Sequence, residues 1–271
     1  MDPVEKAFVE AARDRARGAA AIERRLLGRL LTLDVATPAA YRRGARALRD
    51  GQPVMANLVS LAARAASDEP AAFRTWAAAR LETLRGLDER LARAAWPTVR
   101  DAAMLVSVSR SSAVAAVIRG AAANGWSGRV VVLDGAPSGR GRDQARSLAR
   151  TGLDVLSQPD AAALRWLEPC SVVVVGADAV GPRSFVNSVG TRLLLEAAGR
   201  RARPRLLVAD RGKDLEAVDL ERLRRTSPMA GVEGSGRRWP VFEEVPLALV
   251  DVRVDEHGHR SFADGAGRDV E

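Results

Sequence analysis

The sequence has little cysteine, few aromatic residues, almost no lysine and no long apolar run. One cysteine, Cys170, occurs among 271 residues, so no disulfide can form within the chain. No stretch approaches the 18 consecutive apolar residues that a membrane-spanning helix needs. Residues 1–25 are charged throughout and lack the apolar centre of a signal peptide. We therefore expect a cytoplasmic protein without a membrane segment, with Cys170 as a small buried core residue.

The net charge of +8 comes almost entirely from arginine, because lysine occurs only at Lys6 and Lys213. The arginines are scattered beside acidic residues, as in Glu23-Arg24-Arg25, which is typical of solvated helix faces. Aromatic residues make up 4% of the chain and do not alternate with the basic ones, as they do in proteins that bind single strands. Nucleic acid is therefore not expected to be the main partner.

The first hundred residues have the spacing of successive helices. Apolar residues recur every three or four positions, and no run rich in β-branched residues interrupts them. Thr37-Pro38 has the pattern of a helix start, and Gly51 that of its end. Further helices are predicted from Pro53 towards Ala66, and as one long helix from Pro70 to Trp96-Pro97. We predict an all-helical N-terminal domain of residues 1–100.

Residues 101–271 alternate between short β-branched runs and helix-like stretches. The strand-like runs are AAMLVSVS, RVVVLD, LDVLS, CSVVVVGAD and RPRLLVAD. The stretches between them are SSAVAAVIRGAAANG, GRDQARSLARTG, DAAALRWLEP and TRLLLEAAGRRA. This alternation predicts a parallel sheet with helices on both faces, a Rossmann-like α/β domain. The segment VPLALVDVRVDEHGHRSFAD predicts a short helix, a strand and a tight turn.

Ligands of open parallel sheets bind at the carboxyl ends of the strands. The segments that follow the predicted strands there are Ser107–Ser112, Asp134–Arg142, Asp178–Asn187 and Asp210–Lys213. Together they provide a carboxylate, hydroxyls, an amide, flexible glycines and the cations Arg142 and Lys213. Because cations and helix N-termini together bind phosphate, we predict a crevice for a phosphorylated polar metabolite.

Each of these features also has a purely structural interpretation. Asp178 could cap a turn, and GAPSGRGR, which lacks the P-loop pattern, could be a surface loop. Lys213 favours a functional role, because a chain that otherwise uses arginine places a compact point charge at a strand exit. His257 and His259 flank a glycine in a turn and have no metal-ligating neighbours, so we predict neither a metal nor a cofactor.

Several of these motifs together resemble the initiation factor 2B alpha, beta and delta subunit family. The family also contains methylthioribose-1-phosphate isomerase and ribose-1,5-bisphosphate isomerase. The resemblance rests on GADAV, a later asparagine (Asn187) and a Gly-Thr that opens a helix. Gly141-Arg142, LLVADRGKD and PVFEEVPLALVDVRVDEHG support it, and Arg17-Gly18-Ala19 with Ile22 weakly resembles a phosphate-holding motif. It covers residues 100 to 260 well and the first hundred loosely.

The resemblance implies a role for several residues. In the isomerases of this family, a cysteine after the first strand works with the aspartate of the GAD motif to convert an aldose 1-phosphate into a ketose. Asp178 matches that aspartate, and Asn187 and Lys213 match substrate-binding positions. An enzyme of this kind would be an intramolecular oxidoreductase. The resemblance also implies a homodimer that forms through the α/β domain.

The sequence departs from the family at the first strand. Ser109 stands in place of the isomerase cysteine, and a hydroxyl is a far weaker acid than a thiol. Neither Val108 nor Arg110 is a base that could activate it. Two positive charges of the family are replaced by Ala136 and Ser188, and Arg110 could restore one of them.

Two hypotheses therefore stay open. The chain binds a phosphorylated sugar or nucleotide between its domains, with Ser109 and Asp178 as candidate catalytic residues of an altered isomerase. Alternatively it is a non-catalytic regulatory or assembly protein. The apolar run in WPVFEEVPLALVDVRV adds modest support for a homodimer, unless this segment covers the edge of its own sheet.

Overall fold

A computed structural model of the chain describes residues 1–14, 17–215, 229–231, 238–262 and 268–270. The α-helices are α1 (Pro3–Arg13), α2 (Ala19–Thr32), α3 (Pro38–Gly51), α4 (Ala56–Ser67), α5 (Pro70–Leu84), α6 (Leu87–Val99), α7 (Ser112–Ala123), α8 (Gly141–Ala149) and α9 (Thr191–Arg200). Short 3-10 helices are η1 (Asp160–Trp166), η2 (Arg211–Lys213) and η3 (Leu247–Leu249). The strands are β1 (Met104–Val108), β2 (Arg129–Leu133), β3 (Asp154–Gln158), β4 (Ser171–Gly176), β5 (Ala179–Val180), β6 (Ser184–Ser188), β7 (Arg205–Val208), β8 (Met229–Gly231), β9 (Arg238–Pro240), β10 (Phe242–Pro246), β11 (Val252–Asp255), β12 (Gly258–Ser261) and β13 (Arg268–Val270).

The N-terminal helices begin where the local sequence satisfies their first N–H groups. Asp2 accepts a hydrogen bond from the Val4 N–H, and Thr37 accepts one from the Ala40 N–H. Each cap is followed by a proline at the first helical position. The long helix expected after Pro70 is instead two helices, because Gly86 takes a left-handed φ of 63° between α5 and α6.

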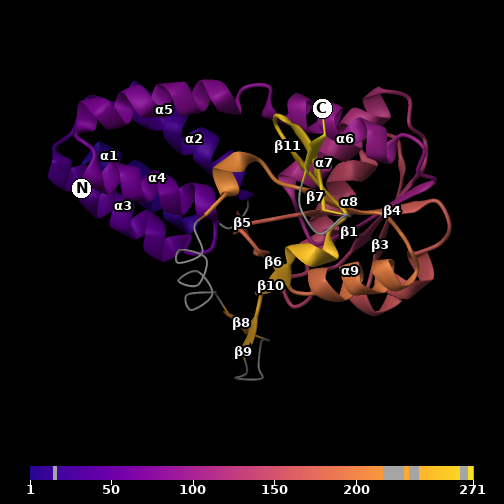
Figure 1. The fold of residues 1–271 in the computed structure, drawn as a ribbon. Coiled ribbons are helices and arrows are strands. Elements are labelled where there is room, and N and C mark those ends of the chain that lie inside the picture. Colours follow the sequence, from indigo (N-terminus) through magenta and orange to yellow (C-terminus); the bar gives the residue numbers. More distant parts are fainter. Residues whose placement is uncertain (15–16, 216–228, 232–237, 263–267, 271) are drawn as a thin grey trace.

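The predicted parallel α/β sheet is confirmed. Among the described residues its strand order is β13-β12-β11-β7-β4-β1-β2-β3, and it is parallel from β11 to β3. Helices α6, α7 and α8 pack on one face, and α9 and η1 pack on the other (Figure 1). Alternate residues of each strand, such as Val172 and Val173, enter the two cores separately. The first of these cores continues without a break into helices α1–α5.

A smaller antiparallel sheet of β10, β6 and β5 lies between the helices and the main sheet (Figure 1). The segment Asp178–Asn187, which follows a predicted strand and for which the sequence suggested only a loop, instead forms β5 and most of β6. The partner of β6 is β10, which follows more than fifty residues later, so no local pattern signals the pairing. Phe185 and Val186 are buried in it.

The C-terminal prediction of a short helix, a strand and a tight turn is confirmed as η3, β11 and the turn into β12. The burial predicted for Cys170 is wrong. Its thiol is exposed and its backbone has a φ of 64°, so the buried strand begins one residue later. No helix in the described ranges is long and apolar enough to span a membrane.

Candidate functional site

The strand order creates a switch point between β1 and β4 at the carboxyl edge of the main sheet. The chain leads from β1 outward through β2 and β3, and then returns to place β4 on the other side of β1. At such a switch point the loops after the two central strands diverge and leave a crevice. Ser109 follows β1 and Asp178 follows β4, so both candidate catalytic residues lie at this point.

Ser109 has a strained backbone and a closed environment. Its φ is 60°, which is unusual for a residue with a side chain, and it is 2% exposed. Gly135 lies so close that a Cβ there would be 2.5 Å from the Ser109 Cβ. The Ser109 hydroxyl accepts a hydrogen bond from the Ser188 hydroxyl at 3.1 Å. In the described part of the chain its side-chain partner is thus another hydroxyl rather than a base.

Asp178 is half-buried and held by its backbone on both sides. Its N–H donates to the Val186 carbonyl at 2.8 Å, and its carbonyl accepts from the Ala56 N–H at the start of α4 at 2.9 Å. Desolvation raises the pKa of the Asp178 carboxyl, although the charges of Lys213 and Arg140 act to lower it. The carboxyl is therefore easier to protonate than an ordinary aspartate.

Lys213 is buried, and its charge acts on this carboxylate. Its Nζ donates to the carbonyl of Ala177, the residue before Asp178, at 2.6 Å. The turn η2 that carries it begins at Asp210, whose carboxylate accepts from the Gly212 N–H at 3.1 Å. Leu215 then bonds to Val180 of β5 and fixes the exit of the turn. Among the described residues the ammonium thus has one hydrogen-bond partner, which leaves two further N–H donors.

The segment Asp134–Arg142, which follows β2, carries Arg140 and Arg142. The two side chains have different surroundings. Arg142, which the sequence favoured, turns to Asp134 and donates to its Oδ2 at 3.0 and 2.8 Å. These hydrogen bonds lower the pKa of Asp134. Arg140 immediately precedes α8, and its charge acts on both Asp178 and Arg110. The repeated GRGR pattern offers no local signal that distinguishes the two arginines.

Arg110 is a half-buried cation without full compensation. Its Nη2 is buried and has no hydrogen-bond partner among the described residues. Desolvation, followed by the charge of Arg140, lowers the pKa of Arg110, although Asp143 and Asp14 oppose this. A buried N–H without a partner is costly, and two neighbouring guanidinium groups repel each other. A bound anion would relieve both.

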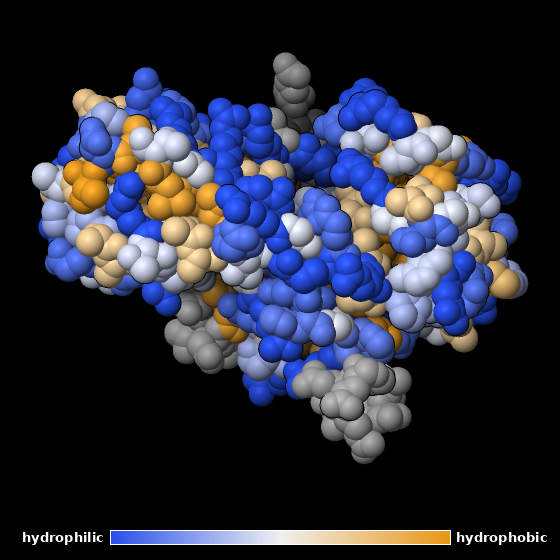
Figure 2. Space-filling view, turned by 90° about the horizontal axis from the view of Figure 1, so that it is seen from above, coloured by the Kyte–Doolittle hydropathy of each residue, from blue (hydrophilic) through white to orange (hydrophobic). Residues whose placement is uncertain are grey.

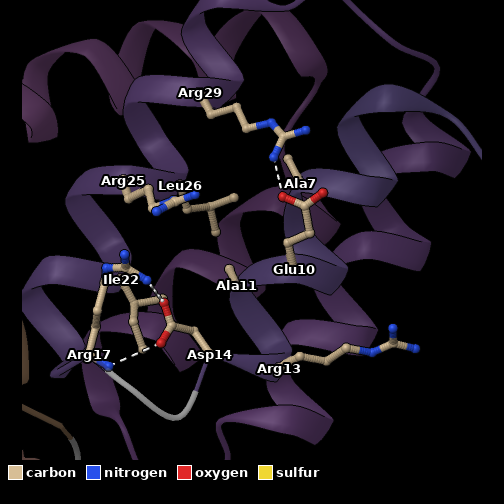
Figure 3. Close-up of a pocket in the computed structure, with 10 residues that line it drawn as sticks. All are labelled: Ala7, Glu10, Ala11, Arg13, Asp14, Arg17, Ile22, Arg25, Leu26 and Arg29. Atoms are coloured by element: carbon tan, nitrogen blue, oxygen red, sulfur yellow. Dashed lines mark hydrogen bonds and ion pairs between the residues drawn. The ribbon is translucent and has the colours of Figure 1, made fainter.

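The other residues predicted to bind substrate or phosphate have mainly structural contacts. Gly18 lies beside α7, since a Cβ there would be 3.5 Å from the Ser112 hydroxyl. Arg17 turns away and pairs with Asp14 at 2.8 Å (Figure 3). Asn187 lies on β6 and donates to the Thr191 hydroxyl at 3.0 Å.

Gly141 has a structural role at the start of α8. Its N–H donates to the Asp134 carbonyl at 2.9 Å, and a Cβ there would lie 2.0 Å from the Leu133 carbonyl oxygen. Ser109 and Arg110 thus follow β1, and Asp178 follows the adjacent β4 within the influence of the Lys213 charge, whereas Arg142 and Arg17 pair with Asp134 and Asp14. Among the described residues, no group of three His, Cys, Asp or Glu side chains could hold a metal ion.

A chain of buried polar contacts ties this crevice to the N-terminal helices. Arg80 of α5 donates to Glu23 of α2 at 2.7 Å, and its Nη2 lies 3.5 Å from Asp210. Asn57 of α4 donates to the same Glu23 at 2.7 Å. Gly212 of η2 leaves room for the Arg80 guanidinium, which a Cβ would meet at 2.2 Å. The turn that carries Lys213 is therefore fixed to three helices.

The fold is that of an α/β protein with a helical N-terminal region and polar side chains at the switch point of its sheet. The sequence profile of the Initiation factor 2 subunit family matches residues 45–226, which is well over half of the chain. The chain therefore belongs to this family, as the sequence motifs predicted.

Relatives with assigned names are distant. Ribose 1,5-bisphosphate isomerase from Haloferax volcanii is 28% identical over 172 residues, which cover 59% of this chain and 53% of that protein. The Thermococcus kodakarensis protein of the same name is 24% identical over 183 residues, 63% of this chain and 57% of the relative. The chain thus matches little more than half the length of these relatives.

Solved structures share the fold. The translation initiation factor eIF-2B of Pyrococcus horikoshii OT3 has a TM-score of 0.82 at 22% identity, over 96% of this chain and 97% of that one. The 5-methylthioribose 1-phosphate isomerase of the same organism has a TM-score of 0.69 at 15% identity, over 95% and 84%. At these identities the likeness establishes the fold alone.

Proposed function

We propose that this chain binds a small phosphorylated sugar in the crevice between its helices and its sheet. The observation that carries the proposal is the incompletely compensated pair of cations Arg110 and Arg140 near a carboxyl with a raised pKa. The phosphate would bind the two guanidinium groups and the N-terminus of α7, where Ser111 and Ser112 stand. The sugar hydroxyls would then face Asp178 and Lys213.

Asp178 is the group in this site that is suited to exchange protons with the sugar. Its raised pKa makes both of its protonation states accessible closer to neutral pH. Opening a sugar ring requires a proton on the ring oxygen, and a protonated Asp178 could donate it. The names of the distant relatives support this chemistry, which makes an aldose-ketose isomerase the first candidate activity.

Ser109 favours the second candidate, a non-catalytic protein that senses the same ligand. Its hydroxyl contacts Ser188 and no base in the described part of the chain, so it does not replace a thiolate. In that case ligand binding in the crevice would regulate an assembly of the protein. The assembly we propose is a homodimer formed through the α/β domain.

Calorimetry and a ketose assay separate these candidates. The purified protein is titrated with ribose 1,5-bisphosphate and with 5-methylthioribose 1-phosphate, and ketose formation is followed in parallel. Turnover that Asp178→Asn abolishes would establish the isomerase. Binding without turnover would establish the sensor, and failure to bind either compound would refute the proposed function.

A further inference from the structure

A groove in the N-terminal region runs between α1 and α2 (Figure 3). It has a volume of 430 Å³, which lies in the range of sites for small ligands. Its floor is apolar, with Ala7, Ile22 and Leu26 at no more than 3% exposure. A hollow with a dry apolar floor suits the body of an organic molecule better than a hydrated ion.

The walls of this groove carry more positive than negative charge. The charged lining residues are Arg13, Arg17, Arg25, Arg29, Glu10 and Asp14. Arg29 pairs with Glu10 near one end, and Arg17 pairs with Asp14 near the other (Figure 3). Arg25 lies between these two pairs and extends beside Leu26. The described part of the chain gives the Arg25 guanidinium no ion pair and no hydrogen bond.

We propose that the α1/α2 groove binds a small organic anion, a phosphate ester or carboxylate with an apolar body. The body would cover Ile22 and Leu26, and the anionic group would pair with Arg25. A guanidinium presents two parallel N–H groups that match either anion. This site is separate from the crevice, and its existence does not depend on the proposed function.

The groove adjoins the proposed sugar-phosphate site at Arg17 and Gly18. Asp14 and Arg17 line the groove, and Gly18, which follows Arg17, lies against Ser112 at the start of α7. The negative charge of Asp14 also acts on Arg110. A ligand that drew Arg17 away from Asp14 would therefore alter the charge that Arg110 experiences. A groove ligand is thus placed to modulate anion binding in the crevice.

An arginine-rich surface attracts anions in general, so the chain must supply a matched control. Arg24 is the neighbour of Arg25 on α2 and is also exposed, but its contact is Asp88, at 4.0 Å, and it does not line the groove. Arg24→Gln and Arg25→Gln remove the same charge from the same helix turn. Only the second should affect a ligand that lies in the groove.

The sequence provides a simple spectroscopic probe, because its only isoleucines are Ile22 and Ile118. Methyl labelling of isoleucine gives one signal in the groove floor and one in the core under α7, and Ile118→Val assigns them. The probes are 2-naphthyl phosphate, inorganic phosphate and 2-naphthol, which supply the anion and the apolar body together or one at a time. We expect 2-naphthyl phosphate to shift the Ile22 signal, at far lower concentration than the other two, and to leave Ile118 in place.

The variants then test the anchor. Arg25→Gln should weaken the titration followed at Ile22 by about tenfold or more, as the loss of a charged hydrogen bond predicts. Arg24→Gln and Arg140→Gln should leave it unchanged, and the Arg24 and Arg25 variants should melt like the parent. An Ile22 signal that does not move would overturn the proposal, as would equal losses in the Arg24 and Arg25 variants. If 2-naphthol bound as tightly as 2-naphthyl phosphate, the groove would not recognise the anionic group, and the proposal would be overturned.

Discussion

The Asp178 carboxyl is subject to two opposing influences. Desolvation raises its pKa, while the neighbouring charges of Lys213 and Arg140 lower it, and desolvation is the stronger. Lys213 is bonded to the Ala177 carbonyl rather than to the carboxylate. The cation thus limits the rise without pairing with the acid, which keeps Asp178 able to gain and lose a proton.

This shift predicts how stability depends on pH. Because the folded pKa lies above the unfolded one, the folded state binds more protons as pH passes between the two values, and stability falls as pH rises there. Asp178→Asn removes this dependence. The free energy of unfolding of the variant, taken relative to that of the parent, should therefore increase as pH rises from below the ordinary pKa of aspartate. Urea titrations of both proteins across pH measure the difference; a difference independent of pH, or one of opposite sign, would contradict the assignment.

Arg140 and Arg142 provide a matched pair for the anion site. Arg142 is already bonded to Asp134 with an exposed side chain, whereas Arg140 acts on Arg110 and Asp178. Arg140→Gln should weaken the binding of a sugar phosphate by about 1.5–3 kcal/mol, the range for a hydrogen bond to a charged group. Arg142→Gln should have little effect on affinity. Calorimetry with ribose 1,5-bisphosphate compares the two affinities. A larger loss in Arg142→Gln than in Arg140→Gln would show that Arg142, and not Arg140, binds the anion.

The contact of α5 with η2 depends on one buried arginine. The Arg80 side chain is 14% exposed, and its carboxylate neighbours Glu23 and Asp210 are 2% and 5% exposed. Removing the shared cation leaves two buried carboxylates without compensation, which is among the more destabilising changes a protein can undergo. This turn also carries Lys213, so the crevice should be affected together with stability.

Arg80→Met should lower the free energy of unfolding by about 3–5 kcal/mol. The exposed pair Arg85–Glu82 is the control, and Arg85→Met should cost less than about 1 kcal/mol. Adding Glu23→Gln to Arg80→Met should recover part of the loss, because one uncompensated charge disappears. Urea unfolding measures all of these, and equal effects at Arg80 and Arg85 would show that the buried network does not hold the turn.

The elements that could be predicted are those with purely local signals. The valine-rich runs specify β2 and β4, and Thr37-Pro38 specifies the start of α3, because adjacent residues contain the whole signal. The pairing of β6 with β10 could not be predicted, because its two halves are far apart in the sequence. The break at Gly86 was missed because apolar spacing continues through it, and only its left-handed backbone ends α5.

The same distinction applies to the candidate site. Ser109 and Asp178 were predicted because each comes after a predicted strand and matches a family position, and the strand order places the ends of those two strands side by side. Arg142 was predicted and Arg140 was not, since the direction of each arginine side chain depends on where α8 starts. Asn57, Glu23 and Arg80 gave no signal at all, because their network forms only when three helices meet η2.

Most of the C-terminal apolar residues give no support to a homodimer, although Trp239 is 39% exposed. Val245, Leu247, Val250 and Val254 are all buried within the chain, since β10 pairs with β6 and β11 with β7. The segment thus extends its own sheets, which is the alternative that the sequence left open. Other apolar side chains stay exposed on the α9 face of the main sheet, namely Leu193 of α9 at 61% and Leu164 of η1 at 54%.

We expect the homodimer to use this face, because exposed leucines on elements that cover one face of a sheet are typical of an association surface. Leu193→Glu should shift the protein towards the 28.9 kDa monomer in sedimentation at micromolar concentration. Val35 in the N-terminal region has the same 61% exposure, so Val35→Glu adds the same charge elsewhere and should leave the dimer intact. A parent protein that sediments as a single 28.9 kDa species would refute the homodimer. A dimer that tolerates Leu193→Glu would instead exclude the α9 face, because a charge buried without a partner in an interface is strongly destabilising.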